Sequence, residues 1–417
     1  MSNSPQSSRP SLSAFIFPEP FTSATNVNAE RHVIVAPEKD GAIVAEVGRA
    51  FSAFRDEFVD SVGAVNHNPY NGTSLRVGAG GESYLLRIGQ GWRTKDRRDV
   101  LDGMHVFYQV LAEAGVPTAH FLPTKEGGFI GRFGGEDAGH NCTLSPWIES
   151  EGRFAGGPER AHQLGTLLGR MHQALLEEGQ LGGDRFESMQ AACSANANTP
   201  YGRYISAEEL RASVFGKKDS SPVSEFRQML AACSEHYLTD GFEKLREYGF
   251  RLEMLDQDLQ IVHGDIISQN ILALGHKPST GMADPESEGL GLVILDPEKM
   301  YFGSRYFDIG QGLLTALRES AQHGNGTLEA SNMFLLGGQI TAEFCRGYEE
   351  SFGKPVDRNK AAAFALLRIN QNMYVYGQNM VSEKGCENLQ KSQVASQALG
   401  YCAAMREATM LLGNAIS

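Results

Sequence analysis

The chain has 417 residues, of which 41% are hydrophobic and 21% are charged, as in a globular protein with room for two lobes and a large core. Its formal net charge of −13 disfavours nucleic acid or an anionic membrane as the main partner, because both are polyanions that bind basic surfaces. The six cysteines lack Cys-x-x-Cys spacing and no apolar run is as long as a membrane span, so we expect a protein of the reducing cytoplasm without a zinc site.

The first part of the chain predicts a small β-sheet and two helices. Residues 1–30 are rich in Ser, Pro and Asn and are expected to form a flexible arm. Apolar residues at helical spacing predict an amphipathic helix over 42–62. Two alternating runs flank the glycine-rich segment 78–81 and predict a β-hairpin. A helix over 96–114 would end at Gly115, and strands are expected at 129–133 and 142–148.

The second part is mainly helical. A helix is expected over 161–175, in which His172 is more readily explained as a packing residue than as a catalytic base. Residues 274–290 are rich in Gly and Pro and predict a loop. Apolar periodicity predicts further helices at 336–349, 360–376 and 394–413.

Two motifs carry the residue types that phosphoryl transfer needs. In Ile261-Val-His-Gly-Asp-Ile-Ile-Ser-Gln-Asn270, Asp265 can orient a nucleophilic hydroxyl and Asn270 can ligate Mg²⁺. In Ile294-Leu-Asp-Pro-Glu298, Asp296 and Glu298 are two further oxygen ligands. An apolar run precedes each motif, so each is expected to follow a short buried strand.

These motifs resemble those of the aminoglycoside phosphotransferase family, which also holds choline, homoserine and methylthioribose kinases. The resemblance covers most of residues 60 to 320 and includes a further acid, Asp308, about a dozen residues after the Asp-Pro-Glu. It implies an ATP- and Mg²⁺-dependent phosphotransferase that moves the γ-phosphate to a hydroxyl of a small molecule of the sugar, amino alcohol or amino acid type. Asp265 is then the catalytic carboxylate, and His263 and Asp308 support its loop.

The resemblance also implies the fold and the domain organisation. We expect an α+β, protein-kinase-like fold of two lobes. A small antiparallel β-sheet lobe would occupy residues 31–148, with a hinge near 143–150. A larger, mostly helical lobe would occupy 149–417 and contain the catalytic and metal motifs at 261–310.

The nucleotide-binding residues follow from the same comparison. Arg87 stands where the family has a Lys or Arg that contacts phosphates. Gly72 belongs to the turn-rich segment 68–74, the candidate for the turn over the phosphates, with 78–81 as a rival. Met104 stands near the position of the acid that usually pairs with the basic residue, so that ion pair is not assigned. The adenine ring is expected against the hinge residues Ser145, Trp147 and Ile148.

The acceptor pocket is expected among the C-terminal helices, where Arg368, Gln371 and Tyr374 cluster. Arg368 can bind a carboxylate or phosphate, and a tyrosine can bind a sugar or cation face. A polar solvent face with core tyrosines explains the cluster equally well.

Several functions stay open at this point. An antibiotic kinase of the aminoglycoside type, a protein Ser/Thr kinase of the stress-response type, and a nucleotide-binding pseudokinase are alternatives to a metabolite kinase. The expected partner is a small molecule with a hydroxyl group. The sequence leaves the choice between ATP and GTP open, and also the oligomeric state, a homodimer included.

Overall fold

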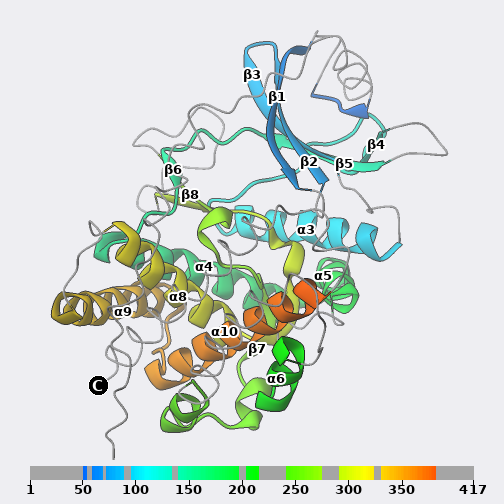
Figure 1. The fold of residues 1–417 in the computed structure, drawn as a ribbon. Helices are drawn as coiled ribbons and strands as arrows, with labels where there is room; N and C mark the ends of the chain where they lie inside the picture. The colour runs from blue at the N-terminus through cyan, green and yellow to red at the C-terminus, as the bar shows by residue number, and fades with distance from the viewer. Residues whose placement is uncertain are drawn as a thin grey trace, which may run out of the picture.

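A computed structural model describes residues 50–53, 59–68, 72–88, 95–133, 140–196, 203–215, 241–274, 291–323 and 330–381. The expected arm at 1–30, most of the expected loop at 274–290, and the expected helix at 394–413 lie outside these residues. In Figure 1 a β-sheet forms the upper part of the molecule and helices form the lower part. This is the α+β, kinase-like arrangement that the sequence predicts.

The upper sheet has five antiparallel strands in the order β1-β2-β3-β5-β4. The turn between β2 and β3 consists of Gly80 and Gly81, whose φ angles of 60° and 81° suit the two-residue hairpin turns that favour glycine. The predicted hairpin is therefore confirmed. The strands are β1 (Val59–Asn68), β2 (Gly72–Ala79), β3 (Glu82–Ile88), β4 (Gly131–Phe133) and β5 (His140–Pro146).

The helix predicted over 42–62 is wrong at its C-terminal end, because residues 59–62 begin strand β1. Of the apolar residues whose helical spacing gave this prediction, Val62 lies in β1, and Phe51 forms an isolated bridge to Thr124, followed by a turn at 52–53. Strand β1 pairs with β2 along most of its length, with register shifts between Val59 and Ser61 and between Ala64 and Asn66. Cross-strand pairing therefore outweighs the local pattern.

Helix α3 (Lys95–Glu113) lies beneath the sheet in Figure 1 and agrees with the predicted helix at 96–114. It ends as the sequence suggests: Gly115 has a φ of 67°, and the Val116 amide donates to the Leu111 carbonyl at 2.9 Å. Its buried face includes Leu101, Met104 and Phe107. Met104 is thus a core residue at the place where an acid was sought.

The lower part contains the remaining helices of the described residues and two small sheets. Helix α4 packs along α9 so closely that a Cβ on Gly165 would lie 2.0 Å from the Phe344 carbonyl oxygen. The helices are α4 (Pro158–Leu181), α5 (Asp184–Ala195), α6 (Ala207–Phe215), α8 (Tyr306–His323), α9 (Ala330–Phe352) and α10 (Arg358–Val381). The small strands are β6 (Gly152–Arg153), β7 (Leu259–Val262), β8 (Ile271–Ala273), β9 (Leu292–Ile294) and β10 (Tyr301–Ser304).

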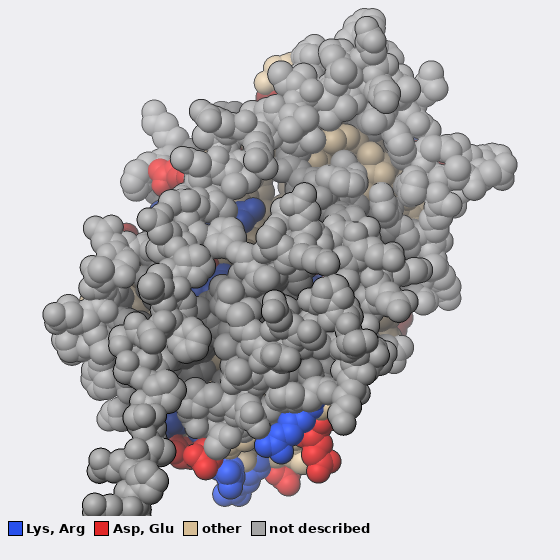
Figure 2. All heavy atoms as spheres, in the orientation of Figure 1, with Lys and Arg blue, Asp and Glu red and all other residues tan. Residues whose placement is uncertain are grey.

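Among the described helices, none combines the length and the apolar composition of a membrane span. The described charges on the face drawn in Figure 2 include acidic and basic side chains intermixed along its lower edge.

His105 on α3 makes folding stability depend on pH. Its ring stacks on Phe129 with 3.5 Å between ring centroids, and burial lowers its pKa to about 4. Between pH 6.5 and about 4 the unfolded chain binds a proton at this residue that the folded chain does not, so stability falls as the pH falls through this window. When the pH is lowered from 7.5 to 5, the melting temperature of His105→Phe should therefore fall less than that of the wild type. An equal loss in thermal unfolding would contradict this assignment.

Candidate active site

Two short strand pairs bring the two sequence motifs together. Strand β7 pairs with β10, with Val262 opposite Tyr301, and β8 pairs with β9, with Ile271 opposite Ile294. The catalytic loop, which begins at His263, connects β7 to β8, and the metal motif, which begins at Asp296, connects β9 to β10, so the two strand pairings bring these two connections together. The Leu295 amide also donates to the Asn270 carbonyl at 2.8 Å, which fixes one motif against the other.

Gly264 is required where the catalytic loop turns. Its φ of 78° is left-handed, and a Cβ at this position would lie 2.3 Å from the carbonyl oxygen of Lys299. The obstacle is backbone, so it cannot rotate away. This explains why glycine stands at this position.

Gly264→Ala should therefore displace the catalytic loop and lower turnover by about 100-fold or more. Circular dichroism and initial rates measured on the same preparation test this. Gly81→Ala is the matched control, since Gly81 also has a positive φ but a Cβ there would meet no atom within 4 Å. Equal loss of turnover in both variants would show that the catalytic loop is not the sensitive element.

Asp308, at the start of α8, fixes the backbone of the catalytic loop. Its Oδ2 accepts from the His263 amide at 2.7 Å and its Oδ1 accepts from the Gly264 amide at 2.9 Å. Burial raises the pKa of Asp308, but the hydrogen bond with His172 and the charges around it outweigh burial and hold the pKa below its usual range. The buried His172 lies 3.2 Å from Asp308 and 2.8 Å from the Tyr348 hydroxyl, so it supports the loop anchor from within the core.

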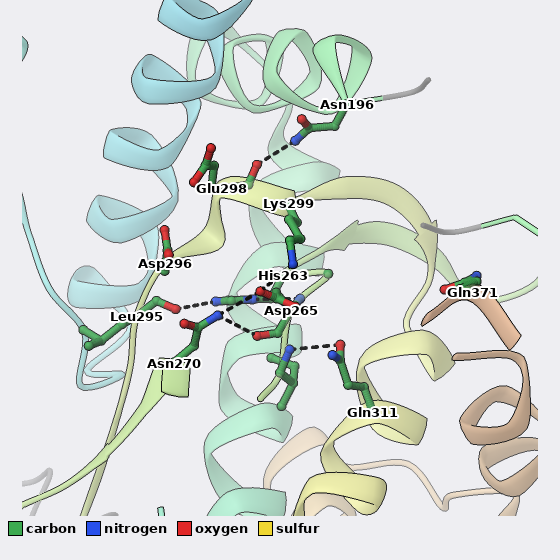
Figure 3. A network of polar contacts seen from close by, with 12 residues as sticks. Asn196, His263, Asp265, Asn270, Leu295, Asp296, Glu298, Lys299, Gln311 and Gln371 are labelled. Carbon is green, nitrogen blue, oxygen red and sulfur yellow. Dashed lines mark hydrogen bonds and ion pairs between the residues drawn. The ribbon is translucent and has the colours of Figure 1, made fainter. Parts of the chain in front are cut away.

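His263 links the catalytic loop to the metal motif, as Figure 3 shows. Its Nδ1 accepts from the Asp265 amide at 3.2 Å, which places the ring proton on Nε2, the donor to the Leu295 carbonyl at 2.9 Å. The imidazole thus bridges the two motifs.

The Asp265 carboxylate lies at the centre of the site and is largely buried. Its Oδ2 accepts from Lys299 Nζ at 2.9 Å and from Asn270 Nδ2 at 3.1 Å. Its Oδ1 lies 3.5 Å from Arg368 Nη2. Lys299, Asn270 and Arg368 therefore fix the position of this carboxylate through three side chains that come from different segments of the chain.

Asp296 lies across the site from Asp265 and has the left-handed backbone angles φ 63° and ψ 58°. Its amide donates to the Tyr108 hydroxyl at 2.8 Å, so α3 stabilises this strained residue. Its carboxylate accepts two hydrogen bonds from Arg87, at 2.8 and 3.3 Å. Burial disfavours both charges, but their attraction is stronger: the pKa of Asp296 is lowered and that of Arg87 is raised.

The donor set fits a magnesium ion that is shared with a nucleotide. Within the described residues no group of three His, Cys, Asp or Glu side chains is gathered as a metal cluster. The Asn270 NH₂ group donates to Asp265, so its amide oxygen is the atom that could ligate a metal, and Asp296 could contribute a carboxylate. Magnesium commonly takes one or two such protein ligands and completes its shell with phosphate oxygens and water. Glu298 lies farther along, beside α3, and its charge acts on Arg87.

The residues predicted to bind the nucleotide lie on the sheet and at its edge. Gly72 begins β2 opposite Asn68, so the β1–β2 turn comprises residues 69–71, which lie outside the described residues. Ser145 is buried and pairs with Leu85 of β3. The next residues leave the sheet: Trp147 donates its amide to the Ser83 carbonyl at 2.8 Å, and Ile148 follows it, half-buried.

The three residues predicted to bind the acceptor differ in burial and in what they contact. Arg368 and Gln371 are buried, and Arg368 contacts the catalytic loop instead of an open pocket. Gln371 donates to the Arg203 carbonyl at 2.8 Å. Tyr374 is half-buried, and the guanidinium carbon of Arg203 lies 5.4 Å from the centroid of the Tyr374 ring. These contacts favour a supporting role for the first two residues.

Four further residues complete the site and were not predicted from the sequence. Lys299 follows the metal motif directly, so its place three residues after Asp296 was the available signal. Asn196 holds the same segment by donating to the carbonyls of Glu298 and Met300 at 2.8 and 2.9 Å. Gln311 accepts from the Ile266 amide at 3.0 Å. Neither of these two, nor Tyr108, carries a local sequence signal, because chain folding alone brings each to the site.

Known proteins provide two comparisons. The sequence model of the "Phosphotransferase enzyme family" matches residues 70–331, more than half of the chain. Among solved structures, a spectinomycin phosphotransferase in complex with ADP and spectinomycin has a TM-score of 0.56 at 15% identity, covering 90% of this chain and 97% of that one. An amicoumacin kinase in complex with AMP-PNP, Ca²⁺ and its ligand has a TM-score of 0.53 at 14% identity, covering 90% and 97%.

An aminoglycoside phosphotransferase from Alicyclobacillus acidocaldarius has a TM-score of 0.51 at 15% identity, covering 94% of this chain and 98% of that one. At these identities the likeness concerns the fold. No curated protein sequence matches the chain.

Proposed function

Because the chain belongs to the phosphotransferase enzyme family, we propose that it transfers the γ-phosphate of ATP to a hydroxyl of a small molecule, with Mg²⁺ as the metal. The observation that supports this most is the placement of Asp265 and Asp296 on adjacent loops of one site, with Asn270 between them. Phosphoryl transfer needs such an arrangement, since the acceptor hydroxyl and the metal-bound phosphate must meet in line.

Each residue then has a defined task. Asp265 accepts a hydrogen bond from the acceptor hydroxyl and aims its oxygen at the γ-phosphorus. Asn270 and Asp296 hold Mg²⁺, which neutralises the phosphate charge when it is bound. Arg87 moves from Asp296 towards the phosphates, and Lys299, with 37% of its side chain exposed, leaves Asp265 for the transferred group.

The charges beside Asp265 bear on the class of acceptor. In the described part of the site, the side chains that contact its carboxylate are Lys299, Arg368 and the neutral Asn270. With Lys299 on the transferred group, Arg368 still balances the charge of Asp265, so this carboxylate offers a polycationic aminoglycoside no net negative charge and a neutral or anionic acceptor is favoured. We therefore favour a metabolite kinase, with an antibiotic kinase as the alternative.

The second candidate is a nucleotide-binding regulator without transferase activity. It is favoured by the core position of Met104 and by the pairing of Arg87 with the metal carboxylate Asp296 instead of an acid on α3. In this case the nucleotide would bind and turnover would be absent.

Transfer of labelled phosphate from ATP and Mg²⁺ to a panel of methylthioribose, choline, homoserine, aminoglycosides and a protein substrate separates these functions. We expect label in a neutral or anionic small molecule. Label confined to aminoglycosides would select the antibiotic kinase, and label in the protein substrate would select a protein kinase. Nucleotide binding without any labelled acceptor would support the regulator.

A further inference from the structure

Arg368 is a buried cation directly behind the catalytic loop. It lies on α10 and is 1% exposed. A guanidinium is costly to bury unless its donors are used, so its contacts indicate what it does there. The guanidinium contacts residues of the active site.

One end of the guanidinium reaches the catalytic loop. Nη2 donates to the Gly264 carbonyl at 2.6 Å and lies 3.5 Å from Asp265 Oδ1. Nη1 donates to Gln371 Oε1 at 3.3 Å, one turn along the same helix. The planar group is thus fixed on α10 and directed at the peptide that carries the catalytic carboxylate.

The opposite side of the loop is closed as well. A Cβ on Gly264 would lie 2.3 Å from the Lys299 carbonyl oxygen and 3.0 Å from the Tyr301 ring. The loop therefore packs against the segment after the metal motif and is also held by Arg368.

We propose that Arg368 is a positioning residue for phosphoryl transfer: it holds the Gly264 carbonyl and the Asp265 carboxylate so that Oδ2 faces the acceptor hydroxyl. Its role in the reaction rests on the proposed function, whereas its hold on the loop is a property of the free protein. Arg368 would then act through Asp265 and not by binding the acceptor, the role that its sequence context suggests.

Three variants test this proposal. Arg368→Met removes the charge with little change in volume, and Arg368→Lys keeps the charge but loses the planar fork. Lys360→Met is the matched control, because Lys360 is a buried cation on the same helix whose Nζ donates to Asp258 at 2.7 Å, and among the described residues it makes no direct hydrogen bond with the catalytic loop. Melting temperature and ADP affinity are measured for each variant.

The readouts are kcat, the KM for the acceptor, and hydrogen exchange of the peptide that spans 261–270 in the free protein. Arg368→Met should lower kcat by about 100-fold with KM within about threefold, and should speed exchange of that peptide. Arg368→Lys should recover about a tenth of the wild-type kcat. Lys360→Met should lower the melting temperature without changing kcat or exchange at 261–270. If Arg368→Met does not fold, the lysine variant decides with the same readouts.

Two results would overturn the proposal. A raised KM with unchanged kcat and unchanged exchange would make Arg368 an acceptor-binding residue after all. If Lys360→Met lost as much kcat as Arg368→Met, the loss in the Arg368 variant would be explained by lower stability of helix α10 and not by contact with the catalytic loop. If the wild-type protein transfers no phosphate, the proposed function fails, and the exchange comparison still decides whether Arg368 holds the loop.

Discussion

Asp265→Asn should lower the turnover number by about three orders of magnitude while leaving the affinity for magnesium–ADP within about threefold. The amide keeps the shape of the carboxylate but lacks the charge that orients the acceptor hydroxyl. Nucleotide affinity is expected to be retained because the proposed metal ligands, Asn270 and Asp296, are separate side chains. Initial rates and isothermal titration with ADP measure the two quantities.

The control for this substitution is Asp258→Asn. Asp258 is also an acid paired with a lysine, Lys360, but its contacts lie outside the site. We expect reduced thermal stability and normal turnover in that variant. Turnover of Asp265→Asn within about tenfold of the wild type would remove Asp265 from the reaction.

Asp296→Ala should abolish the contribution of Mg²⁺ to nucleotide binding. In the wild-type protein, Asp296 must exchange the bidentate contact with Arg87 for the metal, so Mg²⁺ and nucleotide are expected to bind together. Without this carboxylate the metal loses its anionic ligand, whereas Arg87 becomes available to the phosphates. The affinity for ADP without Mg²⁺ should therefore be kept or improved, and turnover should fall by about 1,000-fold or more.

The ratio of ADP affinities with and without Mg²⁺ tests this directly. We expect a ratio near one in Asp296→Ala and well above one in the wild type. Glu298→Gln is the comparison, since Glu298 lies farther from Asp265 and should have the smaller effect. A ratio unchanged by Asp296→Ala would place the metal elsewhere.

The sequence predicted those parts of the fold that local patterns determine. The hairpin around Gly80, the end of α3 at Gly115, and the strands before both motifs depend on turn glycines and short apolar runs, and all three are confirmed. Strand β1 was missed because the apolar residues up to Val62 continue a helical spacing, whereas the strand forms through pairing with β2, which is not visible in the local pattern. The fold class itself followed from the resemblance of the motifs and not from periodicity.

The site was predicted only as far as its linear motifs extend. Asp265, Asn270 and Asp296 belong to two short segments, so their spacing was sufficient to propose them, and the structure brings the two segments together. The partner of Arg87 was not predictable, because no acid stands at the expected place on α3 and the contact with Asp296 spans 209 residues. Arg368 was assigned to the acceptor since a polar residue in an apolar helix suggests a ligand, and its burial depends on how α10 packs.

The measurement that tests the central claim most directly is mass spectrometry of an acceptor incubated with the wild type or Asp265→Asn, with γ-¹⁸O-labelled ATP and Mg²⁺. We expect one labelled phosphoryl group on a hydroxyl of a small molecule with the wild type. With Asp265→Asn we expect no such product, although the variant still binds ADP. Equal product from both proteins, or nucleotide binding by the wild type without phosphorylation of any acceptor, would contradict the account.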